Sequence, residues 1–413
     1  MTLLALLEVH RVYQLFIYEQ YITNDLAKLF PDKRNPSKIT HSLVSILKQR
    51  IYSIALGYEN LNDHDHLRKC PALQTTVGTL EDMASSPTLY RFENKAVRQF
   101  AIEVHKLMLD KFIASYKTVP SSLILDFDAT DDEIHGNQEG KFYHGYYRHN
   151  CFFPLYVFCG KKLLVNYLRQ SDQDQAKHAW VILSLLVKYL RKAWSEVEII
   201  FRGDGGFCRH KMLDWCDSNN VKYIVGMAKN NNLNKLLASI MQQASKQFAT
   251  TKEKQRLFSE FQYQAGSWSR QRKIIGKAEV GSLGENPRYV VTNLAGKPED
   301  LYDKIYCTRG DMENRIKEQQ LQLFADRTSC HKWWANQLRL LLSGLAYTLI
   351  EYIRDKLLQG TELAKAQVGT IRLKLFKIGA IIIRNTRSIK FLLASSYPYQ
   401  HIWNSVLKAL ALE

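Results

Sequence analysis

The spacing of apolar residues changes its period along the chain, and this change predicts a mixed α/β architecture. Residues 20–115 repeat apolar positions at intervals of three and four, which is typical of amphipathic helices. From residue 121 onward, short apolar or alternating runs indicate strands. The predicted strands cover 122–128, 151–159, 162–169 and 197–201, and a predicted helix covers 173–194. The expected order is therefore β-β-β-α-β behind a helical N-terminal region.

The second half of the chain continues with elements of both kinds. Alternation with turn residues over 257–293 predicts three antiparallel strands inserted into the fold. The remaining predictions are a helix at 210–218, a strand at 222–227, helices at 306–325 and 332–357, strands at 370–378 and 380–393, and a last helix from about residue 400.

No stretch of the sequence predicts a transmembrane segment or a disulfide framework. The apolar run 338–353 contains Arg339 and Glu351 and is shorter than the roughly 20 residues that a spanning helix needs. Residues 1–22 are interrupted by charges such as Glu8, so they predict an amphipathic helix and not a secretory signal. Seven cysteines without a C-x-x-C pair favour neither disulfides nor structural zinc, and they indicate a reducing cytoplasm.

The charge of the chain predicts a polyanionic partner. Lys and Arg number 57 against 40 Asp and Glu, which gives a net charge of +17. Residues 205–305 carry +7, residues 306–413 carry +8, and no acid occurs between Leu363 and Leu412. Such a surface binds nucleic acid through phosphate neutralisation and counterion release. The alternative is a solvated basic face that only maintains solubility.

Acidic residues stand where two predicted strands end. Asp126 and Asp128 share one face of the strand 122–128, since side chains alternate along a strand. The strand 197–201 runs into Asp204, which is flanked by glycines. If the two strands are neighbours, Asp128 and Asp204 meet at one edge, and their oxygen ligands suit Mg²⁺ or Mn²⁺. The alternative is that these acids only cap turns.

A third acid is offered by the helix predicted from residue 306. Tyr306, Arg309, Glu313 and Lys317 form one stripe at helical spacing. An exposed salt-bridged face is the alternative interpretation of this stripe. The other acids that spacing leaves open are Asp311, Glu318 and Asp326.

The acids and their surroundings resemble the DDE-type transposases of bacterial insertion sequences, whose catalytic domain has a ribonuclease-H-like fold. The pattern Y-x-x-R-x-x-x-E of this family is present at Tyr306, Arg309 and Glu313, behind the predicted β insertion. The other matching blocks are Leu125–Thr130, Gly136–Lys141, Tyr143–Tyr146 and Arg202–Phe207.

The resemblance implies that Asp128, Asp204 and Glu313 are the catalytic acids and bind two Mg²⁺ ions, which Mn²⁺ can replace. Asp126 lies on the same strand face as Asp128. It remains an alternative first acid, and otherwise it is expected to stand behind the metal ligands. The implied fold is a ribonuclease-H-like mixed sheet with flanking helices, an inserted antiparallel β region and a helical N-terminal domain.

The resemblance also implies double-stranded DNA as partner, both terminal inverted repeats and target DNA, with a homodimer pairing two ends. The enzyme would cleave the element ends by hydrolysis and join their 3′-hydroxyls to target DNA, as a cytoplasmic, nucleoid-associated bacterial protein without a membrane partner. Gln320 stands where relatives often have a lysine, so Lys317 is expected to meet the phosphate instead. The expected DNA contacts are Tyr306, Arg309, Lys317, Arg202, His144 and Lys141.

These expectations divide the chain into five parts. They are a helical DNA-binding region (1–118), a first part of the catalytic core (119–235), a β-strand insertion (236–300), a second part of the core that carries the glutamate (301–358), and a basic C-terminal region (359–413). Two alternatives stay open. One is an inactive copy that only binds DNA, and the other is a nucleotide-sugar transferase that uses Asp126-Phe127-Asp128 as a D-x-D metal motif.

Overall fold

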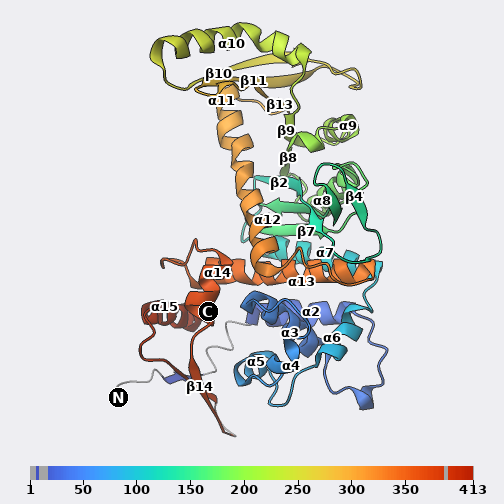
Figure 1. Cartoon of the computed structure of the whole chain (residues 1–413), viewed down its shortest axis with the longest axis vertical. Coiled ribbons are helices and arrows are strands. Elements are labelled where there is room, and N and C mark those ends of the chain that lie inside the picture. The colour runs from blue at the N-terminus through green and yellow to red at the C-terminus, as the bar shows by residue number, and fades with distance from the viewer. Residues whose placement is uncertain (1–5, 9–16, 386–388, 413) are drawn as a thin grey trace.

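The computed structural model describes residues 6–8, 17–385 and 389–412. Helices of the N-terminal region lie at one end of the molecule, a β-rich insertion lies at the other end, and a mixed sheet lies between them (Figure 1). Of the helix predicted over 1–22, residues 17–22 belong to helix α2, while residues 6–8 form the short strand β1 (Leu6–Glu8). The rest of that predicted helix lies outside the described residues.

The central sheet confirms the ribonuclease-H-like class. Its first three strands are antiparallel neighbours, in the order β7-β6-β2, and β2 then continues into the parallel strands β8 and β9. These strands are β2 (Ser122–Ala129), β6 (Leu155–Cys159), β7 (Lys162–Tyr167), β8 (Glu198–Gly203) and β9 (Lys222–Met227). Helices α8 (Ala179–Ala193) and α9 (His210–Ser218) pack on one face of this sheet through a shared apolar core.

The insertion prolongs the same sheet and does not form a separate one. Strands β10 (Gln255–Tyr263), β11 (Arg272–Gly281) and β13 (Arg288–Thr292) add to β9 in the order β10-β11-β13-β9, all antiparallel, with the short β12 (Gly284–Glu285) beside β11. The three predicted strands are therefore confirmed. Helix α10 (Asn231–Thr251), which the strand pattern did not predict, covers them with one apolar face.

A separate small sheet follows β2. It consists of β3 (Asp132–Glu133), β5 (His149–Phe152) and β4 (Phe142–His144), in that order. Residues 151 and 152, predicted to begin the second strand of the main sheet, belong to β5 instead.

Helix α13 (Trp333–Tyr352) separates the sheet from the N-terminal helices (Figure 1). Its side chains are buried on nearly all sides, because one side packs on strand residues such as Phe158 and Leu163 and the other on residues such as Ile46 and Leu47 of α3. A helix that is apolar all round is expected between two layers. The N-terminal helices are α2 (Ile17–Leu29), α3 (Leu43–Leu56), α4 (His64–Leu67), α5 (Pro71–Val77), α6 (Ser86–Glu93) and α7 (Arg98–Ala114).

A long helical rod carries the chain from the insertion back to α13. It begins with α11 (Pro298–Asp300), passes through a π-helical segment η3 (Leu301–Tyr306) and a 3₁₀ turn η4 (Cys307–Arg309), and continues as α12 (Gly310–Leu323). The rod confirms the predicted helix from residue 306. No described helix has the length and apolar character needed to cross a membrane.

The C-terminal region corrects one predicted strand. Residues 370–378 are mostly helical, in α14 (Val368–Ile371) and the π-helical η6 (Arg372–Phe376). Val368, Ile371 and Leu375 are buried at helical spacing, whereas Leu373 is 69% exposed, so the core selects the helical period. The single strand predicted over 380–393 is divided into two antiparallel strands, β14 (Ala380–Arg384) and β15 (Ile389–Leu393). Strand β15 also pairs with β1 and precedes α15 (Gln400–Leu412).

Candidate active site

Asp128 and Asp204 lie at the same edge of the central sheet. Strands β2 and β8 are parallel neighbours with Phe127 opposite Gly203, so the residue that follows each of these positions emerges at the same end. Asp204 caps a 3₁₀ turn by accepting a hydrogen bond from the backbone N–H of Gly206 at 2.9 Å. The tight turn and the strand register together fix where the two carboxylates lie.

Glu313 reaches these acids from the first turn of α12. The guanidinium of Arg309, one turn earlier, joins two of the acids, with Nη1 3.1 Å from Asp128 Oδ2 and Nη2 2.6 Å from Glu313 Oε1. Arg309 thus joins the predicted catalytic acids Asp128 and Glu313, and Asp204 lies near enough for its charge to act on Asp128 and on Arg309.

The electrostatics of Asp128 reflect this crowding. The pKa of Asp128 is raised to about 6, mainly by burial and also by the charges of Asp204 and Glu313, while the charge of Arg309 opposes the rise. Like charges brought close in a partly dry site disfavour ionisation unless a cation balances them. A nearby cation is therefore needed if all three acids are to be ionised together.

The donor set fits a hard divalent cation, because it consists of carboxylate oxygens. However, the three carboxylates do not yet surround a common point where an ion could bind. Among the residues that the structure describes, no three His, Cys, Asp or Glu side chains lie close enough together to hold an ion. Arg309 lies between two of the three acids instead.

Asp126 has a different environment from Asp128. Its two carboxylate oxygens pair with the Nε and Nη2 of Arg202, which stands directly opposite on β8, and both side chains are buried. Arg202 Nη1 also donates to the backbone oxygen of Ile305 and to Thr308 Oγ1 on the rod. This geometry favours Asp128 as the first acid and places Asp126 behind it.

The predicted phosphate contact of Arg202 is therefore not supported by its position. Arg202 is 6% exposed, and three of its nitrogens are bound within the protein. Its bonds join β2, β8 and the rod that carries Glu313. Arg202 thus positions the acids, because it ties together the elements that carry them.

Gln320, which is not an expected phosphate contact, also has a structural partner. Its Nε2 donates to the backbone oxygen of Asp131 at 2.9 Å and to Asp132 Oδ1 at 3.0 Å. The amide thus links α12 to the segment that follows β2. Lys317 lies one turn earlier in the chain and is exposed, as a phosphate contact requires.

The other predicted DNA contacts lie on different elements. Tyr306 is half-buried at the end of η3, and its ring lies 5.5 Å from that of Tyr302. His144 packs against the rings of Tyr147 and Phe153 in the hairpin between β4 and β5. Lys141 donates to the backbone oxygen of Gly136 at 2.9 Å.

The loop 136–141 is tied to the start of α13. Glu139 N–H donates to the backbone oxygen of His331 at 2.9 Å, and Trp333 N–H donates to Glu139 Oε2 at 3.1 Å. Gly140 has a φ of +76°, and a Cβ there would lie 2.7 Å from the Trp333 ring. A glycine is therefore required where this loop crosses the tryptophan.

Sequence reasoning missed two neighbours of the acids. Gln175, in the turn before α8, has its Nε2 3.3 Å from both carboxylate oxygens of Asp204. Tyr147 lies close enough to Asp128 and Asp131 for their charges to add to the burial that raises its pKa to about 12. Neither residue belongs to a strand end or to a periodic stripe, so no pattern pointed to them.

The other acids of the rod region have different surroundings. Glu318 is buried and paired with Arg354, Asp311 is exposed at the start of α12, and Asp326 follows the end of that helix. Their positions favour Glu313 as the third acid.

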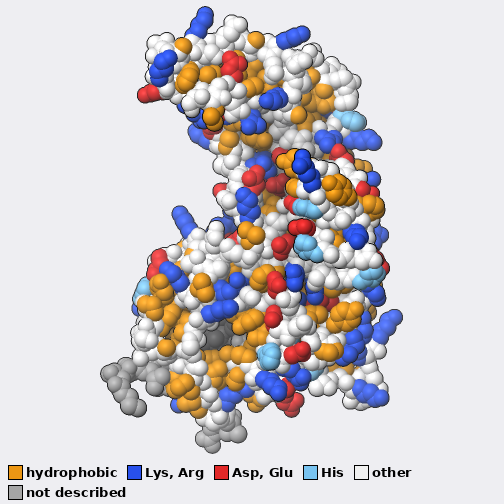
Figure 2. Space-filling view, viewed as in Figure 1, with side chains coloured by type: hydrophobic (Ala, Val, Ile, Leu, Met, Phe, Trp, Pro, Cys, Tyr) orange, Lys and Arg blue, Asp and Glu red, His pale blue; other side chains and the backbone are white. Residues whose placement is uncertain are grey.

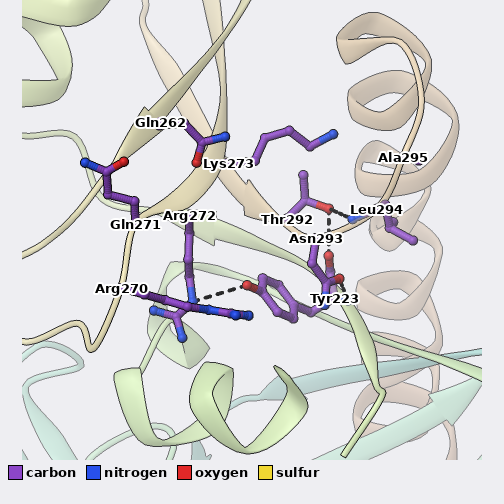
Figure 3. A pocket seen from close by; sticks show the side chains of 10 residues that line it. All are labelled: Tyr223, Gln262, Arg270, Gln271, Arg272, Lys273, Thr292, Asn293, Leu294 and Ala295. Carbon is purple, nitrogen blue, oxygen red and sulfur yellow. Dashed lines mark hydrogen bonds between the residues drawn. The ribbon is translucent and has the colours of Figure 1, made fainter. Parts of the chain in front are cut away.

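Figure 3 shows a cavity of about 340 Å³ beside Tyr223. Because Tyr223 lies near the start of β9, which runs parallel to β8, the cavity is at the opposite end of β9 from the acids. Tyr223 and Arg272 line it, and Arg272 Nη2 pairs with Asp214 at 2.6 Å and with Asp217 at 2.9 Å. The charge of Arg272 is therefore balanced within the protein, and the cavity is distinct from the acidic site.

Comparisons with solved structures give low scores. A cryo-EM structure of the piggyBac transposase synaptic complex with hairpin DNA aligns over 99% of this chain and 88% of that chain, at 11% identity and a TM-score of 0.44. An Argonaute from Marinitoga piezophila with guide RNA and target DNA aligns over 51% of this chain and 30% of that chain, at 11% identity and a TM-score of 0.23.

The sequence of the chain matches a known family over nearly its full length. A search of curated proteins finds no match. The sequence model described as "Transposase DDE domain group 1" matches residues 14–413. This match does not support the nucleotide-sugar transferase alternative, and neither does the ion pair that engages Asp126. The chain belongs to the family of DDE-domain transposases, group 1.

Proposed function

We propose that this chain is an active cut-and-paste transposase of an insertion sequence. It binds the terminal inverted repeats, cleaves phosphodiester bonds at the element ends and joins the 3′-hydroxyl ends to target DNA. The observation that carries this proposal is the meeting of Asp128, Asp204 and Glu313, from two strands and one helix, at one edge of the sheet. We further propose that it acts in the cytoplasm, associated with the nucleoid.

Asp128, Asp204 and Glu313 would hold two Mg²⁺ ions, with Mn²⁺ as a substitute. Such ions supply charge stabilisation at the scissile phosphate and lower the pKa of the attacking water or hydroxyl. Asp126 and Arg202 keep the first two acids in register, because their paired side chains join β2 to β8. Tyr306, Arg309 and Lys317 would orient the DNA backbone beside the acids.

The shape and charge of the molecule support a DNA partner. The space-filling view is hollowed between the insertion at the top and the C-terminal region at the lower left (Figure 2). Exposed bases of the N-terminal region, such as Lys38 and Lys69, would contact the inverted repeat. Lys48 and Arg50 face the interior and would not contribute. Two protomers would pair two DNA ends.

The test is cleavage of a labelled duplex that carries the repeat flanking this gene, in Mg²⁺, in Mn²⁺ and in EDTA. We expect metal-dependent nicking at the repeat end. Asp204→Asn and Glu313→Gln should each lower the nicking rate by roughly 10³-fold or more, because one ligand of the catalytic ions is lost. DNA affinity should change little.

Asp311→Asn is the matched control, since Asp311 is an exposed acid in the same turn of α12 as Glu313. It should cleave at nearly the wild-type rate. Equal cleavage by wild type and by Glu313→Gln would refute the assignment of the third acid. Binding of the repeat without nicking would instead identify a copy that only binds DNA.

A further inference from the structure

The guanidinium of Arg309 lies between two carboxylates of the acidic site, those of Asp128 and Glu313. Its side chain is 15% exposed, and its two terminal nitrogens contact Asp128 Oδ2 and Glu313 Oε1. The contacts join the end of β2 to the first turn of α12. Arg309 is thus the positive charge that lies directly between two of the three proposed metal ligands.

The contacts leave few oxygens of Asp128 for another cation. Asp128 Oδ1 accepts a hydrogen bond from the backbone N–H of Ala129 at 2.9 Å. Its other oxygen, Oδ2, accepts from Arg309. A divalent ion bound through Oδ2 and an arginine bound through Oδ2 would bring two cations to one oxygen. A metal ion that binds through Asp128 Oδ2 therefore competes with Arg309 for that oxygen.

We propose that Arg309 is an internal counter-ion that competes with the divalent metal for Asp128 and Glu313, and that a DNA phosphate releases it. This inference rests on the proposed function, because the phosphate comes from the bound DNA. A guanidinium pairs with phosphate as well as with carboxylate, through the same parallel N–H donors. Phosphate is thus an alternative partner for the same group.

The exchange couples metal binding to DNA binding. If DNA draws Arg309 away from the acids, DNA raises the affinity for metal, and metal raises the affinity for DNA by the same factor. Without DNA the protein would bind metal weakly, so few molecules would have a metal-loaded active site. Cleavage would then be confined to complexes in which a phosphate is already in place.

The experiment is a titration of the full chain with Mn²⁺ in the absence of DNA. Binding of Mn²⁺ is measured by calorimetry and by the loss of the electron paramagnetic resonance signal of free Mn²⁺. Arg309→Gln should bind Mn²⁺ at least about tenfold more tightly than wild type, because a charge-assisted competitor is removed. Arg309→Lys keeps the positive charge but loses the planar guanidinium with its parallel N–H donors. Its affinity for Mn²⁺ should lie between those of wild type and Arg309→Gln.

Arg315→Gln is the matched control. Arg315 lies on α12 and donates to the backbone oxygen of Asp311 at 3.0 Å. Its Mn²⁺ affinity should equal that of wild type within about twofold. Adding uncleaved repeat duplex should tighten Mn²⁺ binding to wild type and leave Arg309→Gln nearly unchanged.

The outcomes separate this inference from the proposed function. Unchanged or weaker Mn²⁺ binding by Arg309→Gln, with wild type active in cleavage, overturns the competition and leaves the transposase activity standing. No Mn²⁺ binding by any variant together with no cleavage overturns both. A thermal melt of each variant shows whether the chain is folded. If Arg309→Gln does not fold, the comparison of Arg309→Lys with wild type still tests the competition.

Discussion

Asp126 and Arg202 face one another on neighbouring strands, and their buried ion pair joins the two strands that lead to Asp128 and Asp204. Asp128, Asp204 and Glu313 could be predicted, because strand ends and a helical stripe are visible in residue spacing. The pairing of Asp126 with Arg202 could not, since it depends on which residues face one another across two strands distant in the chain. The same limit explains why Arg202 was assigned to the DNA backbone.

Arg202 is expected to act on the stability and the geometry of the site. Arg202→Lys removes the bidentate contact with Asp126, because an ammonium cannot reproduce the planar fork. We expect the free energy of unfolding to fall by about 1–3 kcal/mol, as for other damaged buried ion pairs, and cleavage to fall with it. Denaturant unfolding and nicking of the labelled repeat duplex measure the two effects, and filter binding of repeat DNA gives the comparison with Lys317.

Lys317→Gln provides the contrasting variant. Lys317 is exposed on α12, so its loss should weaken DNA binding while it changes the free energy of unfolding by less than about 0.5 kcal/mol. The assignment of Arg202 to the interior would be wrong if Arg202→Lys reproduced this second pattern, with weakened DNA binding and unchanged stability.

Elements were predictable where one period dominates and not where two periods compete. The strands β2, β8 and β9 follow from short apolar runs. In the segment 368–376, Ile371, Leu373 and Leu375 alternate as in a strand, while Val368, Ile371 and Leu375 follow the helical period. Only the packing partners decide between the two. Helix α10 was missed although its buried face, Leu233, Leu237, Met241 and Ala244, has helical spacing.

The contact between helices α3 and α4 predicts a response of stability to pH. His64 is fully buried at the start of α4, where Gln49 Nε2 lies 2.9 Å from its Nδ1, and burial lowers its pKa to about 3. Below pH 6.5 the unfolded chain therefore binds a proton that the folded chain does not. The free energy of unfolding should fall by about 2 kcal/mol between pH 7 and pH 5 from this residue.

His64→Gln should reduce this loss of stability on acidification. The part that remains would include His105, whose pKa burial lowers to about 4. His66→Gln, at an exposed position two residues on, should leave the pH dependence as in wild type. Urea unfolding at a series of pH values makes the measurement, and an identical pH dependence for His64→Gln and wild type would contradict the assignment.

At the scale of the whole molecule, the charge and the succession of elements along the chain were predictable, and the boundaries between parts were not. The net charge of +17 and the succession β-β-β-α-β follow from the sequence, whereas the order of the strands within the sheet comes from the structure. The five proposed parts remain predictions, because one core contains residues of the N-terminal helices, α12, α13 and the C-terminal region together. Sequence composition does not show such sharing, since each part is amphipathic on its own.

The net charge predicts how DNA binding depends on salt. If six or more phosphates are neutralised, the affinity for repeat DNA should fall by roughly 10³-fold between about 50 and 200 mM monovalent salt. Fluorescence anisotropy over this range measures the slope of log affinity against log salt. A slope near zero would contradict a phosphate-based interface.

Helix α13 limits how this transposase can diversify. One side of α13 packs on the N-terminal helices, which would recognise the repeat, and the other side packs on the sheet that carries the acids. Both regions therefore depend on the same helix for their packing. A chimera that takes its first 118 residues from a relative would have to fit a foreign surface of α13 as well. New repeat specificities are therefore expected to arise by point changes on the exposed helices, and not by exchange of a detachable module.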